Sequence, residues 1–319
     1  MQPIEKIAVI GAGTMGHGIA ESFAMHGYSV SVYEPIQEIR DKALEKILKD
    51  LSTLAEFNII DDVAIDGAIE KINLVDDLHK AVKDADFIIE AVPEDIAIKQ
   101  QLFKELNEAA KPEAILASNT SSLDLHEMIL HVDESRKPYC LICHWYNPAH
   151  IVPLVELSSF GNMDDIVLAS IEELFSKINK KTIRVLKNIP GLIANRIQQG
   201  VAREVFSLIE MGAASPSDVE AALKYGPAFR YATTGQLEIA DFGGLDIWCT
   251  VGDNLLPAMN NDQKSNSLLR RKVEKNQLGL KSGEGFFKYS GEHAKDAIEG
   301  FHRKLILQLK TSRMMSEGE

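Results

Sequence analysis

The stretch KIAVIGAGTMG, residues 6–16, decides the fold of this chain. Its first half is a short apolar run typical of a buried strand, and its second half fits the pattern G-x-G-x-x-G. Helical spacing follows over Met15–His26. In that context Gly11 allows a tight turn, Gly13 lets the backbone approach a pyrophosphate, and Gly16 lets helix and strand pack closely. We therefore expect a dinucleotide to bind with its phosphates at the helix N-terminus.

An acidic residue follows the next predicted strand. Residues 29–33, SVSVY, are rich in β-branched side chains and are followed by Glu34, 18 residues after Gly16. A carboxylate at this place accepts hydrogen bonds from ribose hydroxyls and repels a 2′-phosphate, which favours NAD over NADP. The alternative is a glycine-rich turn near an unrelated surface glutamate. The strand, the helix and the acid together favour the cofactor site.

Short strands alternate with helical stretches along the first part of the chain. Further strands are expected at 72–75, 87–90, 114–117, 138–144, 153–157 and 182–186, and helices at 37–69 and 164–178. This alternation predicts an α/β fold with a Rossmann-like, doubly wound, mainly parallel sheet. After Pro190 the pattern is mostly helical. We therefore predict an NAD-binding domain at residues 1–187 and an all-α domain at residues 188–319.

The composition excludes several classes of protein. Lys and Arg number 34 and Asp and Glu 47 among 319 residues, a net charge of −13 that argues against nucleic-acid and anionic-membrane partners. A chain of this length buries a large core without a disulfide or metal, and no metal site is predicted. The N-terminus lacks the pattern of a signal peptide, and no apolar run approaches the length of a membrane span. We expect a cytoplasmic protein.

Two polar segments are candidates for chemistry. SNTSS, residues 118–122, follows a predicted strand, so it either positions a ligand at the sheet edge or is a polar loop that caps a helix. His144 ends another predicted strand, and Glu156 lies twelve residues later in the next. Histidine transfers protons near neutral pH, and a carboxylate can fix its tautomer. The alternative is a structural histidine, since the chain has nine.

The segment Cys140–His144 matches the haem-attachment pattern C-x-x-C-H. We reject that interpretation because the segment is predicted to be a strand, in which residues three apart point to opposite faces. The chain also lacks an export signal. Buried, apolar thiols are the better interpretation.

Several motifs occur together in one order. They are GAGTMGHGIA, EAVPED followed by Lys99, SNTSSL, HWYNPAHIVPLVEL, Asn195-Arg196 and KSGEGFFKY. In this combination the chain resembles the L-3-hydroxyacyl-CoA dehydrogenase family over residues 4–290. The resemblance implies reversible, NAD-dependent oxidation of a 3-hydroxy group to a 3-keto group in fatty acid metabolism. It also implies a helical C-terminal domain that contributes to substrate binding and forms a homodimer.

The resemblance also assigns roles to individual residues. It implies that His144 is the catalytic base and that Glu156 orients it, while Ser121 and Asn195 help to position the substrate and the histidine. The residues implied in NAD binding, together with those of the glycine-rich motif, are Gly11, Gly13, Thr14, Met15, Gly16, Glu34, Glu94, Lys99, Ser121, Asn147 and Lys281.

Two departures from the family pattern bear on the substrate. Acyl-CoA members commonly carry a PVPxMKLVE-like stretch where residues 149–156 read AHIVPLVE. The PLVE ending, with a different loop before it, also resembles relatives that act on CoA-free hydroxy acids, such as L-gulonate and carnitine dehydrogenases. The family's CoA-binding helical hairpin carries a basic residue, whereas residues 51–62, LSTLAEFNIIDD, have none. Lys46 and Lys49 precede this stretch.

Three hypotheses follow. The leading one is a 3-hydroxyacyl-CoA dehydrogenase, for example for 3-hydroxybutyryl-CoA. Its nearest rival is an NAD-dependent dehydrogenase of a free 3-hydroxy acid. The third is a non-catalytic, NAD-binding structural protein, which the intact pair of His144 and Glu156 argues against.

Overall fold

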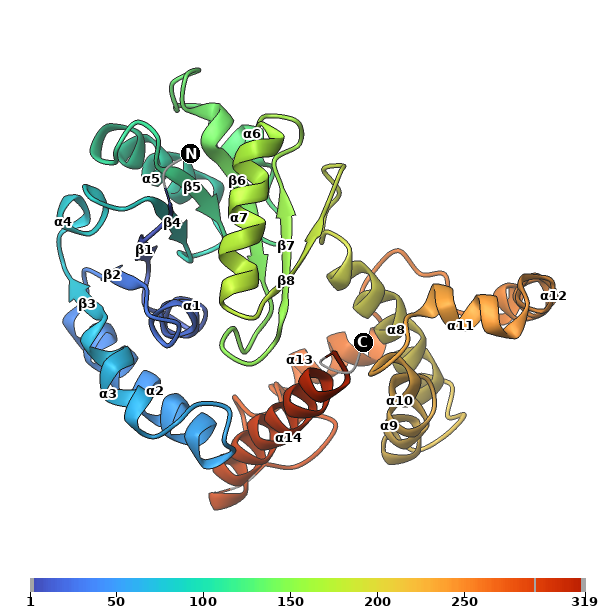
Figure 1. The fold of residues 1–319 in the computed structure, drawn as a ribbon. Coiled ribbons are helices and arrows are strands. Elements are labelled where there is room, and N and C mark those ends of the chain that lie inside the picture. Colours follow the sequence, from blue (N-terminus) through green and yellow to red (C-terminus); the bar gives the residue numbers. More distant parts are fainter. Residues whose placement is uncertain (1–2, 290, 317–319) are drawn as a thin grey trace. The chain divides into compact units, whose positions relative to one another are not determined.

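The computed structural model describes residues 3–289 and 291–316. The chain folds into two units, Met1–Ile193 and Ala194–Glu319 (Figure 1). Leu192 is buried in a core of the first unit, and the backbone N–H of Gly191 donates to the carbonyl oxygen of Ser121. Residues 188–193, which we had assigned to the helical domain, therefore fold with the sheet.

The first unit contains one sheet of eight strands in the order β3-β2-β1-β4-β5-β6-β7-β8. Its strands are β1 (Lys6–Ile10), β2 (Ser29–Tyr33), β3 (Ile72–Val75), β4 (Phe87–Glu90), β5 (Ile115–Ser118), β6 (Cys140–Trp145), β7 (Leu154–Ser158) and β8 (Lys181–Arg184). All neighbouring pairs are parallel except β6 and β7, which are antiparallel. The strand order reverses between β1 and β4, which is where such sheets bind ligands. The predicted doubly wound, mainly parallel sheet is confirmed.

Both faces of the sheet are buried at its centre, because alternate residues of β1, β4, β5 and β6 enter two separate apolar cores. Ile7 and Val9 pack into one core with the helices at residues 16–24, 37–56, 63–70 and 165–177, and Ala8 and Ile10 pack into the other with the helices at residues 78–82, 96–109 and 125–128. Cys140 and Cys143 are free, buried thiols that belong to opposite cores, so the C-x-x-C-H match is a property of a buried strand. Burial raises the pKa of Cys140 to about 12.

The helices of the first unit connect these strands. They are α1 (Gly16–Ala24), α2 (Gln37–Glu56), α3 (Val63–Glu70), α4 (Leu78–Val82), α5 (Ile96–Ala109), α6 (Leu125–Met128), α7 (Asp165–Lys177) and the 3-10 turn η1 (Lys137–Tyr139). The expectation of one helical stretch over 37–69 was wrong. The chain leaves the helix after Glu56, and Asn58 has a φ of 54°, in the left-handed region that ends helices.

The second unit is helical. Its elements are α8 (Ala194–Glu210), α9 (Pro216–Tyr225), α10 (Pro227–Tyr231), α11 (Gln236–Gly243), α12 (Leu245–Leu255), η2 (Leu256–Ala258), α13 (Ser267–Glu274) and α14 (Glu292–Ser316). The side chain of Ser215 accepts a hydrogen bond from the N–H of Asp218 and so caps α9. In the described part of the chain, no helix is both long enough and apolar enough to cross a lipid bilayer.

Candidate active site

The glycine-rich loop lies at the switch point of the sheet, between β1 and α1. Gly11 has a φ of +97°, and its N–H donates to the carbonyl oxygen of Tyr33 on β2. A Cβ on Gly16 would lie 1.8 Å from the carbonyl oxygen of Gly11, so only glycine permits this packing. A Cβ on Gly13 would meet nothing within 4 Å. The loop therefore leaves open space in front of its backbone, which fits the pyrophosphate of NAD.

Glu34 connects the end of β2 to this loop. Its carboxylate accepts from the N–H of Ala12 and from the N–H of Ile36, each at 3.2 Å, and the residue is buried. The Arg40 guanidinium donates to the carbonyl oxygen of Glu34. The acid thus lies beside the glycine-rich turn, where a ribose hydroxyl could replace one backbone donor.

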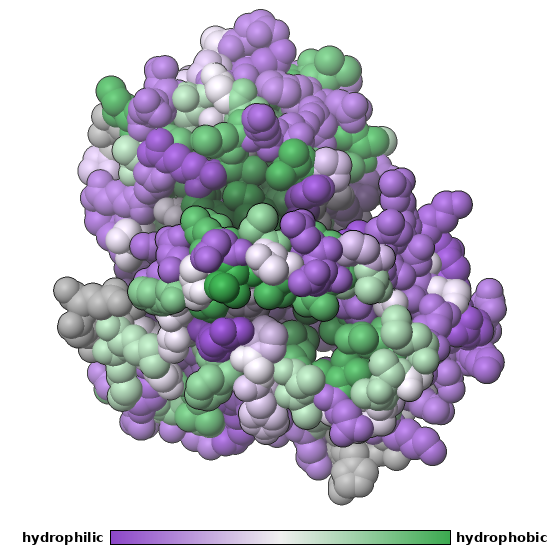
Figure 2. All heavy atoms as spheres, turned by 90° about the vertical axis from the view of Figure 1, so that its right-hand side faces the viewer, coloured by the Kyte–Doolittle hydropathy of each residue, from purple (hydrophilic) through white to green (hydrophobic). Residues whose placement is uncertain are grey.

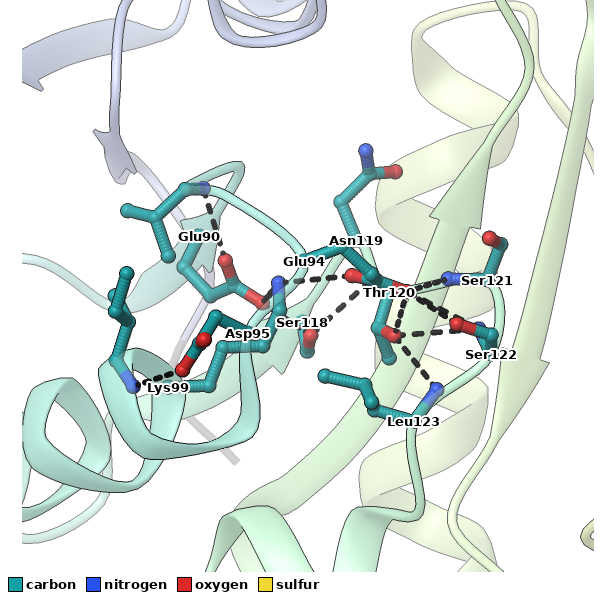
Figure 3. Close-up of polar contacts among 12 residues, drawn as sticks. Glu90, Glu94, Asp95, Lys99, Ser118, Asn119, Thr120, Ser121, Ser122 and Leu123 are labelled. Carbon is teal, nitrogen blue, oxygen red and sulfur yellow. Dashed lines mark hydrogen bonds and ion pairs between the residues drawn. The ribbon is translucent and has the colours of Figure 1, made fainter.

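A buried ion pair lies at the carboxyl ends of β4 and β5 (Figure 3). Lys99, on α5, is 1% exposed, and its Nζ lies 2.6 Å from Oε1 of the fully buried Glu90. The Ser118 hydroxyl also donates to Glu90, and the N–H of Val92 donates to its second oxygen at 3.0 Å. Both ions therefore have the partners that burial of charge requires.

Glu94 organises the polar loop after β5 (Figure 3). Its Oε1 accepts from the Thr120 hydroxyl at 2.6 Å, from the Ser122 hydroxyl at 2.8 Å, and from the N–H groups of Ser121 and Ser122 at 3.2 Å. Its Oε2 lies 3.4 Å from Lys99 Nζ. Partial burial raises the pKa of Glu94, but these hydrogen bonds and Lys99 lower it more, and the pKa falls below its usual value.

His144 and Glu156 face each other across the antiparallel pair β6–β7. Their Nδ1 and Oε2 atoms lie 2.8 Å apart; His144 is buried and Glu156 fully so. The second oxygen of Glu156 accepts from the N–H of Ile193 at 2.9 Å. Because the carboxylate accepts at Nδ1, the second ring nitrogen, Nε2, becomes the proton acceptor of the neutral imidazole. Among the described residues, no hydrogen bond to Nε2 is present.

Asn119 connects the polar loop around Glu94 to the strand that carries His144. Its Oδ1 accepts from the N–H of Trp145 at 2.8 Å, which ties the loop after β5 to the end of β6 beside His144. Asn147, two residues further, is exposed. His144 is thus a buried base that is held by the carboxylate of Glu156, at the same edge of the sheet as the glycine-rich loop. This arrangement is suited to proton transfer coupled to hydride transfer.

The first unit brings most of the predicted site residues to the carboxyl edge of the sheet, but two lie elsewhere in the chain. Asn195 is in the first turn of α8, and Lys281 lies between α13 and α14, both in the second unit. Their roles stay predictions, as do the contacts of Lys99 and Ser121 with NAD.

Sequence reasoning missed Glu90 and its bonds to Lys99 and Ser118. The available signal was an acid that ends an otherwise apolar strand, FIIE, with a lysine nine residues later on the next helix. A charge at the end of a fully buried strand requires a partner.

Comparison with known proteins agrees with this architecture. Residues 6–189 match the NAD binding domain of 3-hydroxyacyl-CoA dehydrogenase, and residues 191–289 match its C-terminal domain. The chain belongs to the 3-hydroxyacyl-CoA dehydrogenase family. It is thus an oxidoreductase of the NAD-dependent type, as predicted.

Individual relatives differ in substrate. The chain is 30% identical over 306 residues, covering 95% of it and 96% of the relative, to 5-formyl-3-hydroxy-2-methylpyridine 4-carboxylate 5-dehydrogenase of Mesorhizobium japonicum. It is 34% identical over 285 residues, covering 89% of it and 100% of the relative, to a probable 3-hydroxybutyryl-CoA dehydrogenase of Deinococcus radiodurans.

Solved structures of related proteins share the fold of this chain. The crystal structure of an NAD⁺-dependent 5-formyl-3-hydroxy-2-methylpyridine 4-carboxylic acid 5-dehydrogenase superposes with a TM-score of 0.89 at 29% identity, covering 97% of this chain and 99% of that one. FadB2 of Mycobacterium tuberculosis superposes with a TM-score of 0.75 at 31% identity, covering 91% and 100%. The family matches end at residue 289, so α14 lies beyond them.

Proposed function

We propose that the protein is an NAD-dependent dehydrogenase of a small, CoA-free acid that carries a hydroxyl or aldehyde group. The hydrogen-bonded pair of His144 and Glu156 supports the proposed chemistry. NAD, when bound, accepts or returns the hydride. The proposed cofactor contacts are the glycine-rich loop and Glu34, with the implied residues Glu94, Ser121 and Asn147 further along the same sheet edge.

The chemistry of the protein's own groups follows from the pair. In oxidation, Nε2 of His144 accepts the hydroxyl proton as the carbon–hydrogen bond breaks. The carboxylate of Glu156, 2.8 Å from Nδ1, stabilises the imidazolium that forms. In reduction the imidazolium returns the proton. Such proton transfer contributes about 10²- to 10⁴-fold to the rate.

The charge of helices α2 and α3 supports a substrate without CoA. From Asp50 to Glu70 the chain has six acidic residues and no Lys or Arg. A CoA thioester brings several phosphates, which an acidic surface repels. The exposed Lys46 and Lys49 precede this stretch on α2. The TM-score of 0.89 with a pyridine-carboxylate dehydrogenase supports the same conclusion.

The second candidate is the 3-hydroxyacyl-CoA dehydrogenase activity that we first favoured. Its support is the group of 3-hydroxybutyryl-CoA dehydrogenases that are 31% to 34% identical to this chain. Fatty acid metabolism would be its setting.

A substrate panel followed at the NADH absorbance band separates the two candidates. It contains acetoacetyl-CoA with NADH, and L-gulonate, carnitine, 3-hydroxybutyrate and pyridine carboxylates with hydroxyl or aldehyde substituents, each with the matching NAD form. We expect turnover of a CoA-free acid. Efficient reduction of acetoacetyl-CoA with no activity on the free acids would overturn the proposal in favour of the second candidate.

We also propose that the protein is a cytoplasmic homodimer that associates through the second unit. Large apolar side chains are exposed on α11 and α12, and Figure 2 shows apolar side chains gathered in patches on the face that it presents. Leu237 is 84% exposed and Phe242 80%. Patches of this kind commonly mark interfaces. Light scattering should give twice the chain mass of 35.3 kDa, and a monomer would refute this assembly.

A further inference from the structure

A buried lysine contacts the loop that connects the strand carrying His144 to the strand carrying Glu156. Lys180 lies between α7 and β8 and is 8% exposed. Its Nζ donates to the carbonyl oxygen of Ala149 at 2.5 Å and to that of Val152 at 2.9 Å. The same ammonium lies 5.1 Å from the ring centroid of Trp145, a cation–π contact. Lys180 therefore contacts both the loop and the strand that carries His144.

The β6–β7 loop, residues 146–153, needs such a partner. The N–H groups of Ile151 and Val152 both turn back to the carbonyl oxygen of Pro148, at 3.1 and 2.9 Å. The loop thus leaves the β6–β7 ladder, and its buried carbonyl oxygens need donors from another element. The Lys180 ammonium carries three N–H donors on one atom and so reaches both carbonyl oxygens, whereas methionine, of similar length, has none.

The other side of the loop packs on α1. A Cβ on Gly18 would lie 3.3 Å from the Cβ of Ala149, so a glycine at this position lets the loop approach the helix. His150 is 5% exposed and points between two acids, with Nδ1 3.9 Å from Glu21 and 3.8 Å from Asp50. The loop is therefore held from both sides by buried groups. It is also the segment at which the sequence departs from the acyl-CoA pattern.

We propose that Lys180 is a positioning residue for the dehydrogenase reaction. Through the carbonyl groups of Ala149 and Val152 it holds the β6–β7 loop, and with it the placement of His144 on one strand and Glu156 on the next. This inference rests on the proposed function, because it assigns the reaction to that pair. The proposed role is exerted through these carbonyl groups and not through contact with a reacting atom.

The test compares two adjacent lysines. Lys180→Met removes the ammonium and keeps a side chain of similar length, and Lys181→Met makes the same change at the exposed neighbouring position. At a temperature well below both melting points, we expect Lys180→Met to lower kcat about tenfold or more. NADH affinity should fall less than kcat, because Asn147 is the one proposed cofactor contact in this loop. Lys181→Met should match the wild type, and Lys180→Arg should recover most of the rate.

Hydrogen exchange of the peptide that covers residues 146–153 gives a readout independent of activity. We expect faster exchange in Lys180→Met and unchanged exchange in Lys181→Met. A lower melting temperature with unchanged kcat and exchange would show that Lys180 only stabilises the fold, and would overturn the proposal. If Lys180→Met does not fold, Lys180→Gln, which removes the positive charge and shortens the side chain, is measured in the same way and decides by the same criteria.

The two proposals fail in different ways. If no acid or thioester in the panel is turned over, the proposed function fails, and the exchange of residues 146–153 still tests whether Lys180 holds the loop. Equal exchange in Lys180→Met and wild type overturns the positioning role even where turnover is found.

Discussion

Two buried pairs at the same edge of the sheet have similar geometry and different capabilities. His144 lies 2.8 Å from Glu156, and Lys99 lies 2.6 Å from Glu90; both carboxylates are fully buried. The Glu90 carboxylate also accepts from Ser118 and Val92, and Lys99 approaches a second acid. In the part of the chain that the structure describes, His144 has one hydrogen-bonded nitrogen and one without a bond.

The difference lies in the base rather than in the distance. An imidazole is suited to gaining and losing a proton in a reaction near neutral pH, whereas a lysine ammonium paired with carboxylates serves as a fixed charge. The histidine pair can therefore accept and return a proton in each turnover. The lysine pair can only hold a fixed charge, and here it anchors α5 to the ends of β4 and β5. A buried carboxylate next to a nitrogen base thus supports proton transfer at His144 and stabilises the fold at Lys99.

Substituting the imidazole should have the largest effect on the reaction. His144→Ala removes the proton acceptor, and we expect kcat to fall by about 10²- to 10⁴-fold. Titration of NADH fluorescence should show cofactor binding close to wild type, because the glycine-rich loop is untouched. A variant that keeps the wild-type rate would show that the His144–Glu156 pair does not transfer the proton.

Substituting the ammonium should instead lower stability. Lys99→Met leaves the fully buried Glu90 without its cation, and breaking a buried pair costs about 3–5 kcal/mol. Urea unfolding at pH 7 measures the loss. The matched control is Lys104→Met, an exposed position on the same helix, which should change stability by less than about 0.5 kcal/mol. Equal effects at the two positions would show that the Glu90–Lys99 pair is not an anchor.

Glu156→Gln tests the orienting role of the carboxylate. Glu156 accepts from both His144 Nδ1 and the N–H of Ile193, but glutamine has a single acceptor oxygen, so one donor is left facing an NH₂ group. The imidazolium also loses its counter-charge. We expect kcat to fall about 10²-fold while NADH affinity is kept. A rate equal to that of wild type would show that His144 works without this partner.

The strands of the sheet were easier to predict from the sequence than the hydrogen-bonded side-chain pairs at its edge. The strands at 6–10, 29–33, 72–75 and 87–90 have the predicted bounds. Those at 6–10 and 87–90 are nearly continuous apolar runs, as expected of parallel strands that are buried on both faces. The break between α2 and α3 was not predicted, since apolar spacing continues through it. Asn58 ends α2 by taking a left-handed conformation that spacing alone does not encode.

Side-chain partners were harder to predict because they depend on the tertiary fold. His144 and Glu156 could be matched from the order of two strands and a short loop. Glu90 ends a buried strand and therefore needs a partner, but a spacing of nine residues to a helix does not by itself identify Lys99 as that partner. Lys180 was missed because it adjoins another lysine in a short connection, where charged residues are usually exposed.

Glu94 marks the solvent-facing edge of the lysine pair and should show the smallest effect. Its folded pKa lies below the ordinary value because hydrogen bonds from Thr120 and Ser122, with Lys99, outweigh partial burial. A depressed carboxyl pKa adds stability above the unfolded value of about 4.3, and this stability is lost as the pH falls through the lower folded value.

Glu94→Gln isolates that charge, since the amide oxygen can still accept the bonds of Oε1. The side chain is 39% exposed, so solvent screens the pair, and we expect a loss of less than about 1 kcal/mol at pH 7. The difference from wild type, measured by urea unfolding, should shrink as the pH falls below about 4.3, because both side chains then become neutral. A difference that stays constant with pH would mean that Glu94 acts through its shape alone. In that case, the electrostatic stabilisation from Lys99 would come from its pair with Glu90 and not from Glu94.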